Sequence, residues 1–408
     1  MERGADVFGK NHRLKNSRRM ALVSSGFPGH ALLGARLDGV IDRALQQRRI
    51  VGTVVLVAHE GKQIYGRAAG LADREAQVPM REDFIFLLAS VTKPIVTAAA
   101  MRLIEDGRVR LDDPVTRWLP QFRPRLADGR VPDITIRHLL THTAGLSYRS
   151  FEPEKSPYHT LDISDGLDQP GLSLSENLSR LARVPLAYEP GTSWRYSLAT
   201  DVLGAVVGKA SSMTLADAVR DLITGPLEMW DTGFKVVDRA RLVVAYADGQ
   251  PEPVRMTDGM VVPLFGAPVT FAPGRIFNPS SYPSGGAGMA GTARDALHFF
   301  ETIRMGGDGI LRGATVEQMF ADQVGAGAQA YGPGWGFGFG WAVLDDPEPT
   351  ATPQSKGTIQ WAGVYGHTWF VDRAKALSVV ALTNTAFEGM SGAFPSEVRD
   401  AIYSALQV

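Results

Sequence analysis

The sequence predicts an α+β fold, with one antiparallel sheet built from both ends of the chain and a mainly helical second lobe from its middle. Two patterns support this prediction. The chain opens as a helix followed by two strands, and it closes as several short strands followed by a helix. Its 408 residues are also enough for two lobes rather than one small core. We therefore expect the terminal helices to cover the sheet.

The first three elements are predicted from periodicity and turn residues. A helix is expected over residues 30–48, and the stretch VGTVVLVAHEGKQIYGRAAG is typical of two strands joined by a turn at Gly61. A second helix begins near Ser90 and runs to about Glu105, where Asp106-Gly107 ends it. The apolar stripe of the first helix consists of Leu33, Leu37, Val40, Ile41, Ala44 and Leu45.

The middle of the chain mixes short helices with loops over residues 108–225. Helical spacing is present in DITIRHLLTHTAGLS, SLSENLSRLARVPL, DVLGAVVGKASSM and TLADAVRDLITGPL. Residues 235–285 lack strong periodicity and are rich in proline and glycine. A loop of this length in a compact protein is usually a lid, a wall of a binding site or disordered. We expect this one to shape the pocket.

The last part of the chain is rich in strands. After a helix in GTARDALHFFETIRM, the segments WGFGFGWAVL, GTIQWAGVYG, HTWFVD and ALSVVALTN are short, β-rich and separated by turn residues. A terminal helix opens at Pro395-Ser396. These elements divide the chain into an α/β domain, residues 27–95 with 285–408, and a helical and loop domain, residues 96–284, that forms one wall of the site.

Composition excludes several classes of function. A net charge of -1 argues against a large basic surface for nucleic acid or anionic membrane, and the absence of cysteine removes disulfides, thiolate metal sites and cysteine nucleophiles. No apolar run approaches the ~18 residues of a membrane span. Residues 1–26 are basic and then polar, so we expect a flexible extension rather than a signal peptide, with Met20 as an alternative start that would place residues 1–19 outside the native protein. A cytoplasmic location is expected.

Ser90 and Lys93 form the pattern Ser-x-x-Lys at the start of the second predicted helix. Residues three apart are neighbours on a helix surface, so the two side chains share one face. A serine hydroxyl becomes a nucleophile when a group takes its proton, and a lysine that burial keeps neutral can do so. Chance gives such a pair in roughly half of chains, and the alternative is a solvated pair. The flanks FLLA and PIVTAAAM leave a lysine little polar surface.

Tyr196 lies in PGTSWRYSLATDVLG, where a loop runs into the helix after Asp201. A phenol with an ordinary pKa near 10 is no base at pH 7, but a phenol beside a lysine ammonium can shuttle protons. The alternative is a tyrosine packed beside Trp194 with its hydroxyl bonded to backbone. Taken alone, the segment favours this second interpretation.

The stretch WAGVYGHTWF is the third candidate and lies on the late strands. Gly363 allows backbone to approach a ligand closely. An N–H group on an edge strand there can complete an oxyanion hole with the N–H of Ser90. The alternative is a glycine-bearing bulge or a tight turn between strands.

Other motifs point away from metals and phosphates. His138 and His142 have the spacing of zinc ligands, but Leu139 stands where the H-E-x-x-H motif has glutamate, so we interpret both histidines as structural. The elbow motif G-x-S-x-G is absent, and SGGAGMAG near Ser284 lacks the lysine of a P-loop. FGFGW is more typical of a sheet than of a stacking platform for bases. We expect no metal, no cofactor and no nucleic-acid partner.

The three candidate motifs occur in an order that resembles the serine β-lactamase and penicillin-binding-protein superfamily. More narrowly, the chain resembles the family VIII carboxylesterases, which are similar to class C β-lactamases. The resemblance spans about residues 30–405 and extends to LIEDGRVRLDDPVTRWLP, ITIRHLLTHTAGLS, PGTSWRYS and SGGAGM. It implies a β-lactamase/transpeptidase-like fold, with an antiparallel sheet flanked by the terminal helices and a mainly helical second lobe.

The resemblance also implies a role for each matching residue. Ser90 matches the acylated nucleophile, Lys93 its proton partner, and Tyr196 the tyrosine that begins the Y-x-N motif. The N–H groups of Ser90 and Val364 match the oxyanion hole. Asp201 is expected close enough to orient the lysine and the tyrosine.

Two departures from the superfamily pattern bear on the substrate. Leu198 replaces the asparagine of Y-x-N, which helps hold amide-bearing β-lactam side chains. Trp361-Ala362-Gly363 replaces the K-T-G motif, whose lysine meets a substrate carboxylate. With Leu198, Trp361 and Gly363 as substrate-binding residues, neutral esters are favoured over penicillins. Aligning GHTWF instead would put His367 in the lysine's place, but related esterases carry W-x-G at the position of WAG.

The expected function is that of a serine carboxylesterase that hydrolyses small-molecule esters through an acyl-enzyme on Ser90. A β-lactamase, a D-amino-acid peptidase and an acyltransferase are the alternatives on the same scaffold. The non-enzyme alternative is a penicillin-recognising binding module, against which the retention of all three candidate groups argues. No membrane partner is expected, and no oligomeric state is predicted.

Overall fold

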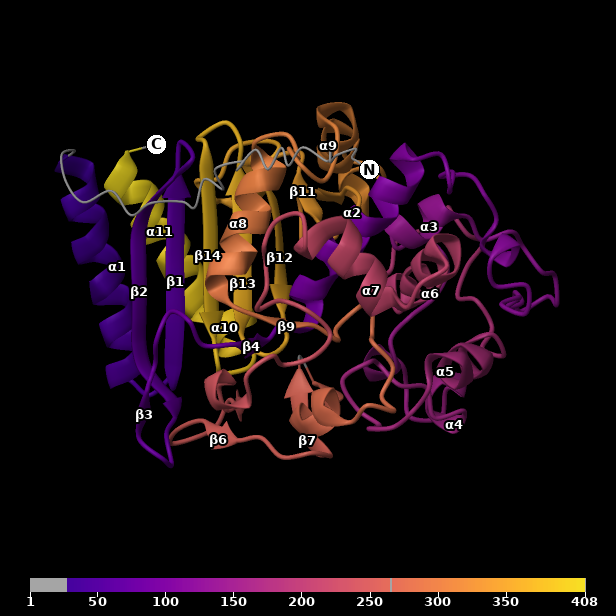
Figure 1. Ribbon diagram of the computed structural model, residues 1–408, viewed down its shortest axis with the longest axis horizontal. Helices are drawn as coiled ribbons and strands as arrows, with labels where there is room; N and C mark the ends of the chain where they lie inside the picture. The colour runs from indigo at the N-terminus through magenta and orange to yellow at the C-terminus, as the bar shows by residue number, and fades with distance from the viewer. Residues whose placement is uncertain (1–27, 265, 408) are drawn as a thin grey trace, which may run out of the picture.

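The computed structural model describes residues 28–264 and 266–407 (Figure 1). The predicted N-terminal extension, residues 1–26, lies outside the described residues. Within the described ranges, no single helix has the length and apolar composition of a membrane span. One pair of helical segments, Ala199–Ser211 and Leu215–Thr224, meets these criteria only when the two are taken together, and they are bent by 80°.

An eight-stranded antiparallel sheet is assembled from both ends of the chain, as the sequence predicts. The two chain ends meet where β1 pairs with β14, in a register that runs from Thr53 opposite Thr383 to His59 opposite Leu377. In spatial order the strands are β10 (Trp335–Phe337), β11 (Ala342–Leu344), β12 (Ile359–Gly363), β13 (His367–Asp372), β14 (Leu377–Thr383), β1 (Gly52–His59), β2 (Lys62–Asp73) and β3 (Val78–Pro79).

Helices cover both faces of this sheet because its central strands are apolar on both sides. On β1, Val55 and Val57 pack against α1 (Pro28–Gln46) and α11 (Ala393–Leu406). The alternate residues Val54 and Leu56 belong to the larger core that includes α2 (Thr92–Glu105) and α8 (Ala293–Arg304). Successive strand residues therefore point to opposite helical layers, and the terminal helices take the position that the sequence predicts.

The helical lobe lies beside the sheet, on the right of Figure 1. One of its helices is shorter than its pattern suggests, because α7 (Leu215–Val219) gives way to a π-helical turn over Arg220–Thr224. The remaining helices are α3 (Ile136–Leu140), α4 (Pro157–Thr160), α5 (Leu174–Leu181), α6 (Ala199–Ser211) and α7 (Leu215–Val219) in the lobe, with α9 (Gly313–Phe320) and α10 (Glu388–Ser391) near the sheet.

Residues 235–285 contain short strands that their composition does not reveal. The hairpin of β7 (Met260–Leu264) and β8 (Ala267–Phe271) is the longest of these pairings. A shorter pairing joins β5 (Tyr246–Ala247) to β6 (Val254–Arg255). Outside this segment, β4 (Phe86–Leu87) pairs with β9 (Ala290–Gly291). The proposed domain boundaries, at residues 95/96 and 284/285, stay a prediction.

Candidate active site

Ser90 sits where a short strand changes into a helix. Strand β4 leads into a 3-10 turn over Ala89–Val91, and α2 follows directly. Ala89 has a φ of 44°, a left-handed conformation that costs a non-glycine residue on the order of 1 kcal/mol. This turn brings Ser90 to the wall of a cavity, with 8% of its surface exposed.

Ser90, Lys93 and Tyr196 meet at one atom. Lys93 Nζ donates a hydrogen bond of 3.0 Å to Ser90 Oγ, and the Tyr196 hydroxyl donates one of 2.7 Å to the same oxygen. The sequence places Lys93 one turn after Ser90, but Tyr196 comes from the loop that leads into α6, more than a hundred residues away. The structure therefore brings together the three residues proposed for acyl transfer.

Lys93 is buried, with 1% of its surface exposed, and polar and aromatic groups surround its ammonium group. Nζ donates a second hydrogen bond, of 2.7 Å, to the carbonyl of Gly286. The rings of Tyr196 and Tyr148 lie with their centroids 4.6 and 5.5 Å from Nζ. A buried cation needs such partners because burial removes its hydration. The side chain of Lys93 is thus buried, as its apolar flanks lead us to expect. Its Nζ still has hydrogen-bond partners in Ser90 and the carbonyl of Gly286.

Asp201 lies next to Gly286, the residue whose carbonyl accepts a hydrogen bond from Lys93. Its Oδ1 accepts a 2.6 Å hydrogen bond from the Ser284 hydroxyl, while within the described residues Oδ2 has no hydrogen-bond partner. Burial raises the pKa of Asp201, and the Ser284 hydroxyl and the Lys93 ammonium oppose that rise. The structure therefore links Asp201 to the lysine through the segment 284–286, and it shows no direct hydrogen bond from Asp201 to Lys93 or Tyr196 in the described chain.

Two aromatic neighbours of Tyr196 were not among the predicted site residues. The ring of Tyr148 lies 5.2 Å from that of Tyr196, and burial raises the pKa of Tyr148 well above 10. The His142 ring lies 5.0 Å from the Tyr196 ring, and its Nδ1 accepts a hydrogen bond from the N–H of Ser197. Burial, helped by the Lys93 charge, lowers the pKa of His142. A neutral His142 packs against Tyr196, consistent with the structural role expected for it.

The second histidine of that motif, His138, has a different role. Its Nδ1 accepts from the N–H of Thr135, and the Thr135 hydroxyl accepts from the N–H of His138. This reciprocal pair caps α3. Among the described residues, no group of three or more His, Asp or Glu side chains is arranged to hold a metal ion.

Trp361 and His367 occupy different places, and this difference favours the alignment that uses WAG. The Trp361 indole N–H donates a 3.2 Å hydrogen bond to the Tyr196 hydroxyl, so Trp361 lies beside the predicted proton shuttle. His367 is buried, and its Nε2 bonds at 2.8 Å to the carbonyl of Leu87. Burial lowers the pKa of His367 to about 4. The tryptophan, not the histidine, therefore stands at the site.

Gly363 lets β12 approach the backbone two residues before Ser90. A Cβ atom at this position would lie 2.8 Å from the carbonyl oxygen of Leu88. The next residue, Val364, lines the same cavity as Ser90. Within the described residues the N–H of Val364 donates no backbone hydrogen bond, so it is available to an oxyanion. Gly363 positions this N–H rather than contacting substrate itself.

The prediction that Leu198 binds substrate is not supported by the structure. Its side chain is 0% exposed, lies in the main hydrophobic core and does not line the cavity. The reason is that Leu198 forms the N-cap of α6, where its side chain turns inward while the preceding turn carries Tyr196 to the cavity.

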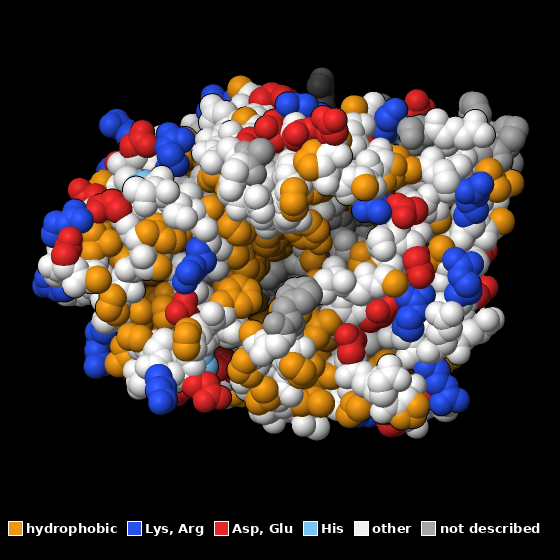
Figure 2. Space-filling model, turned by 180° about the vertical axis from the view of Figure 1, so that it is seen from behind, with side chains coloured by type: hydrophobic (Ala, Val, Ile, Leu, Met, Phe, Trp, Pro, Cys, Tyr) orange, Lys and Arg blue, Asp and Glu red, His pale blue; other side chains and the backbone are white. Residues whose placement is uncertain are grey.

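The cavity beside Ser90 has a volume of about 520 Å³, which is within the range of small-molecule sites. Figure 2 shows it as a hollow with hydrophobic side chains gathered along its walls. The helical lobe contributes Phe151, Trp194 and Tyr196. From residues 235–285, Leu264 at the end of β7 reaches the cavity. Strands β12 and β13 and helices α10 and α11 supply most of the opposite wall.

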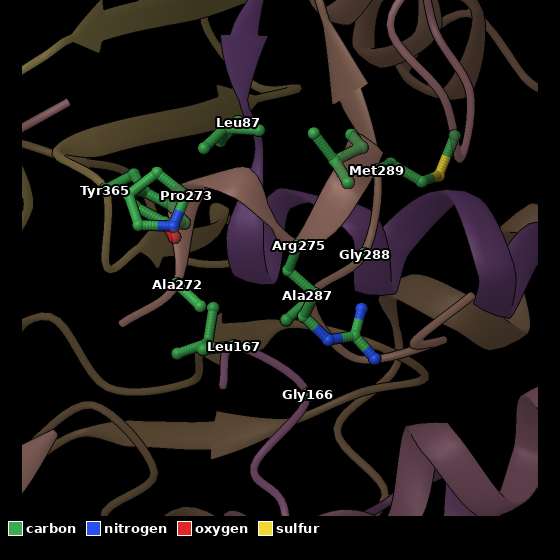
Figure 3. Close-up of a pocket in the computed structure, with 11 residues that line it drawn as sticks. Leu87, Gly166, Leu167, Ala272, Pro273, Arg275, Ala287, Gly288, Met289 and Tyr365 are labelled. Carbon is green, nitrogen blue, oxygen red and sulfur yellow. The ribbon is translucent and has the colours of Figure 1, made fainter. Parts of the chain in front are cut away.

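A second hollow, shown in Figure 3, has a volume of only about 30 Å³. This is about the space that one molecule occupies in liquid water, so the hollow cannot hold an ester. The Arg275 side chain lies beside Ala287 there and donates hydrogen bonds to the carbonyls of Asp168 and Tyr282, at 3.0 and 2.9 Å. Its charge is used to hold these loops together.

The fold and the arrangement of Ser90, Lys93 and Tyr196 agree with the result of a family comparison. A family model described as Beta-lactamase matches residues 37–402. The chain belongs to the beta-lactamase family. This confirms the superfamily that the order of the motifs suggests, and the beta-lactamase-like fold with its antiparallel sheet is confirmed with it.

Relatives within the beta-lactamase family include enzymes named as esterases. The chain is 57% identical over 377 residues to Esterase EstB of Burkholderia gladioli, across 92% of this chain and 96% of that protein. It is 51% identical to the solved structure of EstCE1, a hydrolase with promiscuous acyltransferase activity, with a TM-score of 0.90 over 92% of this chain and 99% of that one. Simvastatin synthase from Aspergillus terreus, at 21% identity and a TM-score of 0.72 over 92% and 99%, shares the fold.

Proposed function

We propose that this beta-lactamase-family chain is a serine carboxylesterase that forms an acyl-enzyme on Ser90. The observation that carries the proposal is the double contact at Ser90 Oγ, where Lys93 Nζ and the Tyr196 hydroxyl lie 3.0 and 2.7 Å away. The pair can take the serine proton in the form in which lysine and tyrosine share one proton, either as an amine beside a phenol or as an ammonium beside a phenolate. The name of Esterase EstB and the description of EstCE1 as a hydrolase support the same reaction.

Acylation follows from this geometry. The Ser90 proton passes to the Lys93–Tyr196 pair as Oγ attacks the ester carbonyl carbon and the carbonyl π electrons move to oxygen. The N–H groups of Ser90 and Val364 stabilise the resulting oxyanion. When the tetrahedral intermediate collapses, the C–O bond to the alcohol breaks. Tyr196 returns the proton to the departing alkoxide, and the acyl group remains on Oγ.

Deacylation repeats the same steps with water. The pair takes a proton from a water molecule whose oxygen attacks the acyl carbon, and the proton then returns to Ser90 Oγ as the carboxylic acid leaves. The Trp361 indole N–H, 3.2 Å from the Tyr196 oxygen, stabilises negative charge that develops on this oxygen during each transfer.

The near end of the cavity favours a neutral group beside the scissile bond. Trp361 occupies the position at which the serine β-lactamase and penicillin-binding-protein superfamily has a lysine. The centroid of its ring lies 4.9 Å from that of Tyr196. An indole offers one N–H donor but no charge, and that donor is already bonded to Tyr196. Trp361 therefore offers no cationic partner to a carboxylate next to the reacting carbonyl. In the superfamily, the lysine of K-T-G provides this partner for the carboxylate of penicillins.

The decisive experiment replaces the nucleophile. Ser90→Ala should lower kcat for p-nitrophenyl butyrate by on the order of 10⁶, the loss expected when a serine hydrolase loses its nucleophile. A fluorophosphonate probe should label the wild type and not the variant. Near-normal turnover by Ser90→Ala, or rapid hydrolysis of nitrocefin by the wild type with no ester turnover, would contradict the proposal.

A second candidate activity is acyl transfer to an alcohol. The solved EstCE1 structure is described as that of a hydrolase with promiscuous acyltransferase activity, and the walls of this cavity are mainly apolar. An alcohol that enters such a cavity can compete with water for the acyl-enzyme. Vinyl acetate supplied with benzyl alcohol should therefore give some benzyl acetate, measured by gas chromatography, and Ser90→Ala should give none. Acetate as the sole product would exclude this activity.

A further inference from the structure

The large cavity continues well beyond the nucleophile, around one strand of the sheet. Strand β11 pairs with β12 only at Ile359 and Gln360, so in the described sheet the stretch Trp361–Gly363 forms an open edge. Trp361 faces the catalytic side, whereas Gln360 and its partner Phe370 face the side of α11. Both sets line one cavity. Part of a substrate can therefore pass the edge of β12 and reach α11.

The far end of this cavity contains one charged side chain. Among the described lining residues, Arg399 is the only acidic or basic one apart from the catalytic residues, and no carboxylate lines the cavity. Pro395 and Arg399 lie four residues apart on α11 and share a partly exposed face of the helix, with Ser396 beside them. The buried face of the helix, Phe394, Val398 and Ile402, packs in the core.

Arg399 is weakly engaged by the protein. Its Nε and Nη2 both approach Oδ1 of the next residue, Asp400, at 2.8 Å. The Asp400 side chain is 58% exposed, so water and salt screen this pair strongly. Among the described residues, Nη1 has no hydrogen-bond acceptor. The nearby carboxylates of Glu388 and Glu397 are already bound by Arg49, at 2.5 and 2.7 Å.

Gln360 adds a second donor with a fixed orientation. The Thr352 hydroxyl donates to Gln354 Oε1 at 2.8 Å, and Gln354 Nε2 donates to Gln360 Oε1 at 3.0 Å. Because the oxygen of the Gln360 amide is used in this chain of bonds, its NH₂ group is the part left for the cavity. Gln354 is buried, which holds the chain in place.

We propose that the far end of the cavity binds a carboxylate at the distal end of an ester substrate, through Arg399 and Gln360. A carboxylate has two planar oxygens that suit a guanidinium and an amide donor together. The proposal rests on the esterase function above and narrows its substrate class to esters that are neutral at the reacting carbonyl and anionic several bonds away. Monoesters of medium-length dicarboxylic acids have this form.

Two matched substrate series test the proposal. In the first, p-nitrophenyl monoesters of glutaric, adipic and suberic acid are compared with p-nitrophenyl esters of neutral acids of equal length. In the second, the acetate ester of 6-hydroxyhexanoate is compared with hexyl acetate, so that the carboxylate lies on the alcohol side. The wild type should prefer the anionic member of one series in kcat/KM, and this preference should weaken as NaCl is added.

Variants assign that preference to its residues. Arg399→Gln should lower the ratio of anionic to neutral kcat/KM about tenfold, mainly through KM, since a charged hydrogen bond is lost. Gln360→Leu should lower it less, and it serves as the second test if Arg399→Gln fails to fold. Arg373→Gln is the matched control, because Arg373 is also a half-buried arginine, bonded to Glu317 and absent from the cavity lining. It should leave the ratio unchanged.

The possible outcomes separate this proposal from the esterase function. The carboxylate site is overturned if neither series shows a preference for the anionic ester. It is also overturned if Arg399→Gln and Gln360→Leu leave the ratio of anionic to neutral kcat/KM unchanged. In either case, hydrolysis of neutral esters still supports the esterase function. If no ester is hydrolysed, calorimetry with monoethyl adipate and Ser90→Ala still decides. The carboxylate site is supported if Ser90→Ala binds the monoester with measurable heat and the double variant with Arg399→Gln does not. Equal binding by these two proteins overturns it.

Discussion

The two ends of the cavity are held by the protein in different ways. At the catalytic end, Ser90, Lys93 and Tyr196 are joined by hydrogen bonds of 2.7 and 3.0 Å, and the lysine is fully enclosed. At the far end, Arg399 and Gln360 are half-buried and keep donors free. In the proposed mechanism, kcat therefore depends on accurate placement of the groups at the near end. The proposed carboxylate site at the far end tolerates movement and affects which ester is preferred.

The largest effect is expected from removing one hydroxyl at the catalytic end. Tyr196→Phe keeps the ring against Trp361 but removes the oxygen that lies 2.7 Å from Ser90 Oγ. We expect kcat for p-nitrophenyl butyrate to fall about 10³-fold, as for loss of a general acid or base. Tyr65→Phe, which loses a 2.7 Å hydrogen bond to Asp38 on the far side of the sheet, is the control and should keep kcat. If Tyr196→Phe and Tyr65→Phe have equal kcat values, the Tyr196 hydroxyl takes no part in proton transfer.

The next effect tests how tightly the lysine is positioned. In Gly286→Ala the new Cβ would lie 2.6 Å from Asp201 Oδ2 and 3.4 Å from Lys93 Nζ, so Asp201 or the carbonyl that holds Lys93 must move, and we expect the carbonyl to be displaced. A displacement near 1 Å costs about 10²-fold in rate. Steady-state kinetics should show this loss in kcat. Gly233→Ala, where a Cβ meets nothing within 4 Å, should match the wild type. Full activity of Gly286→Ala would mean that this carbonyl does not position Lys93.

A pH effect on stability is expected from His367, which joins β13 to the segment before Ser90. Its pKa is lowered to about 4 by burial, against about 6.5 in the unfolded chain. At pH 7.5 both states are neutral, but at pH 5 the unfolded state gains a proton that the folded state excludes. Stability is therefore lost as the pH falls through 6.5 toward 4, by about 2 kcal/mol at pH 5.

Urea unfolding at the two pH values measures this effect. His367→Gln can still donate to the Leu87 carbonyl but does not titrate. The wild type should lose about 2 kcal/mol more than the variant between pH 7.5 and 5. Because other titrating groups are common to both proteins, they cancel in the comparison. Parallel losses in the two proteins would contradict a neutral, buried His367.

The smallest effect compares two tryptophans that line the same cavity. Trp361→Phe removes the indole N–H that bonds the Tyr196 oxygen, and kcat should fall about tenfold, the equivalent of one hydrogen bond. Trp194→Phe removes an indole N–H that has no partner among the described residues, so its effect on kcat should be smaller. If the order of the two effects is reversed, the Trp361 bond does not assist proton transfer.

The sequence predicts the sheet well because its signals are local. Alternating or continuous apolar runs mark β1 and β14, and the helix after Ser90 is bounded by Asp106-Gly107. The hairpin β7–β8 is not predicted, since its strands contain two prolines, Pro263 and Pro268, that weaken a strand pattern.

The residues of the site also divide into those with a local sequence signal, which the sequence predicts, and those without one, which it does not. Ser90 and Lys93 are neighbours in sequence, and a motif reveals them. The Gly286 carbonyl and the Tyr148 ring are parts of the site that only folding brings to Lys93, and neither has a local signal. Arg399 has the appearance of any polar position on a terminal helix. Motif position alone predicts Leu198 as a substrate-binding residue, but the direction of its side chain at the start of α6 places it in the core instead.

The pairing of β1 with β14 has a consequence for the order in which the protein forms during synthesis. Residues near Val55 have their partners near Ala381, more than three hundred positions later. At roughly 5–20 residues per second, the ribosome needs on the order of half a minute to supply them. During that time the β1–β2 hairpin has an unpaired apolar edge, which is a site for aggregation or chaperone binding. The enzyme can therefore become active only after nearly the whole chain has been translated.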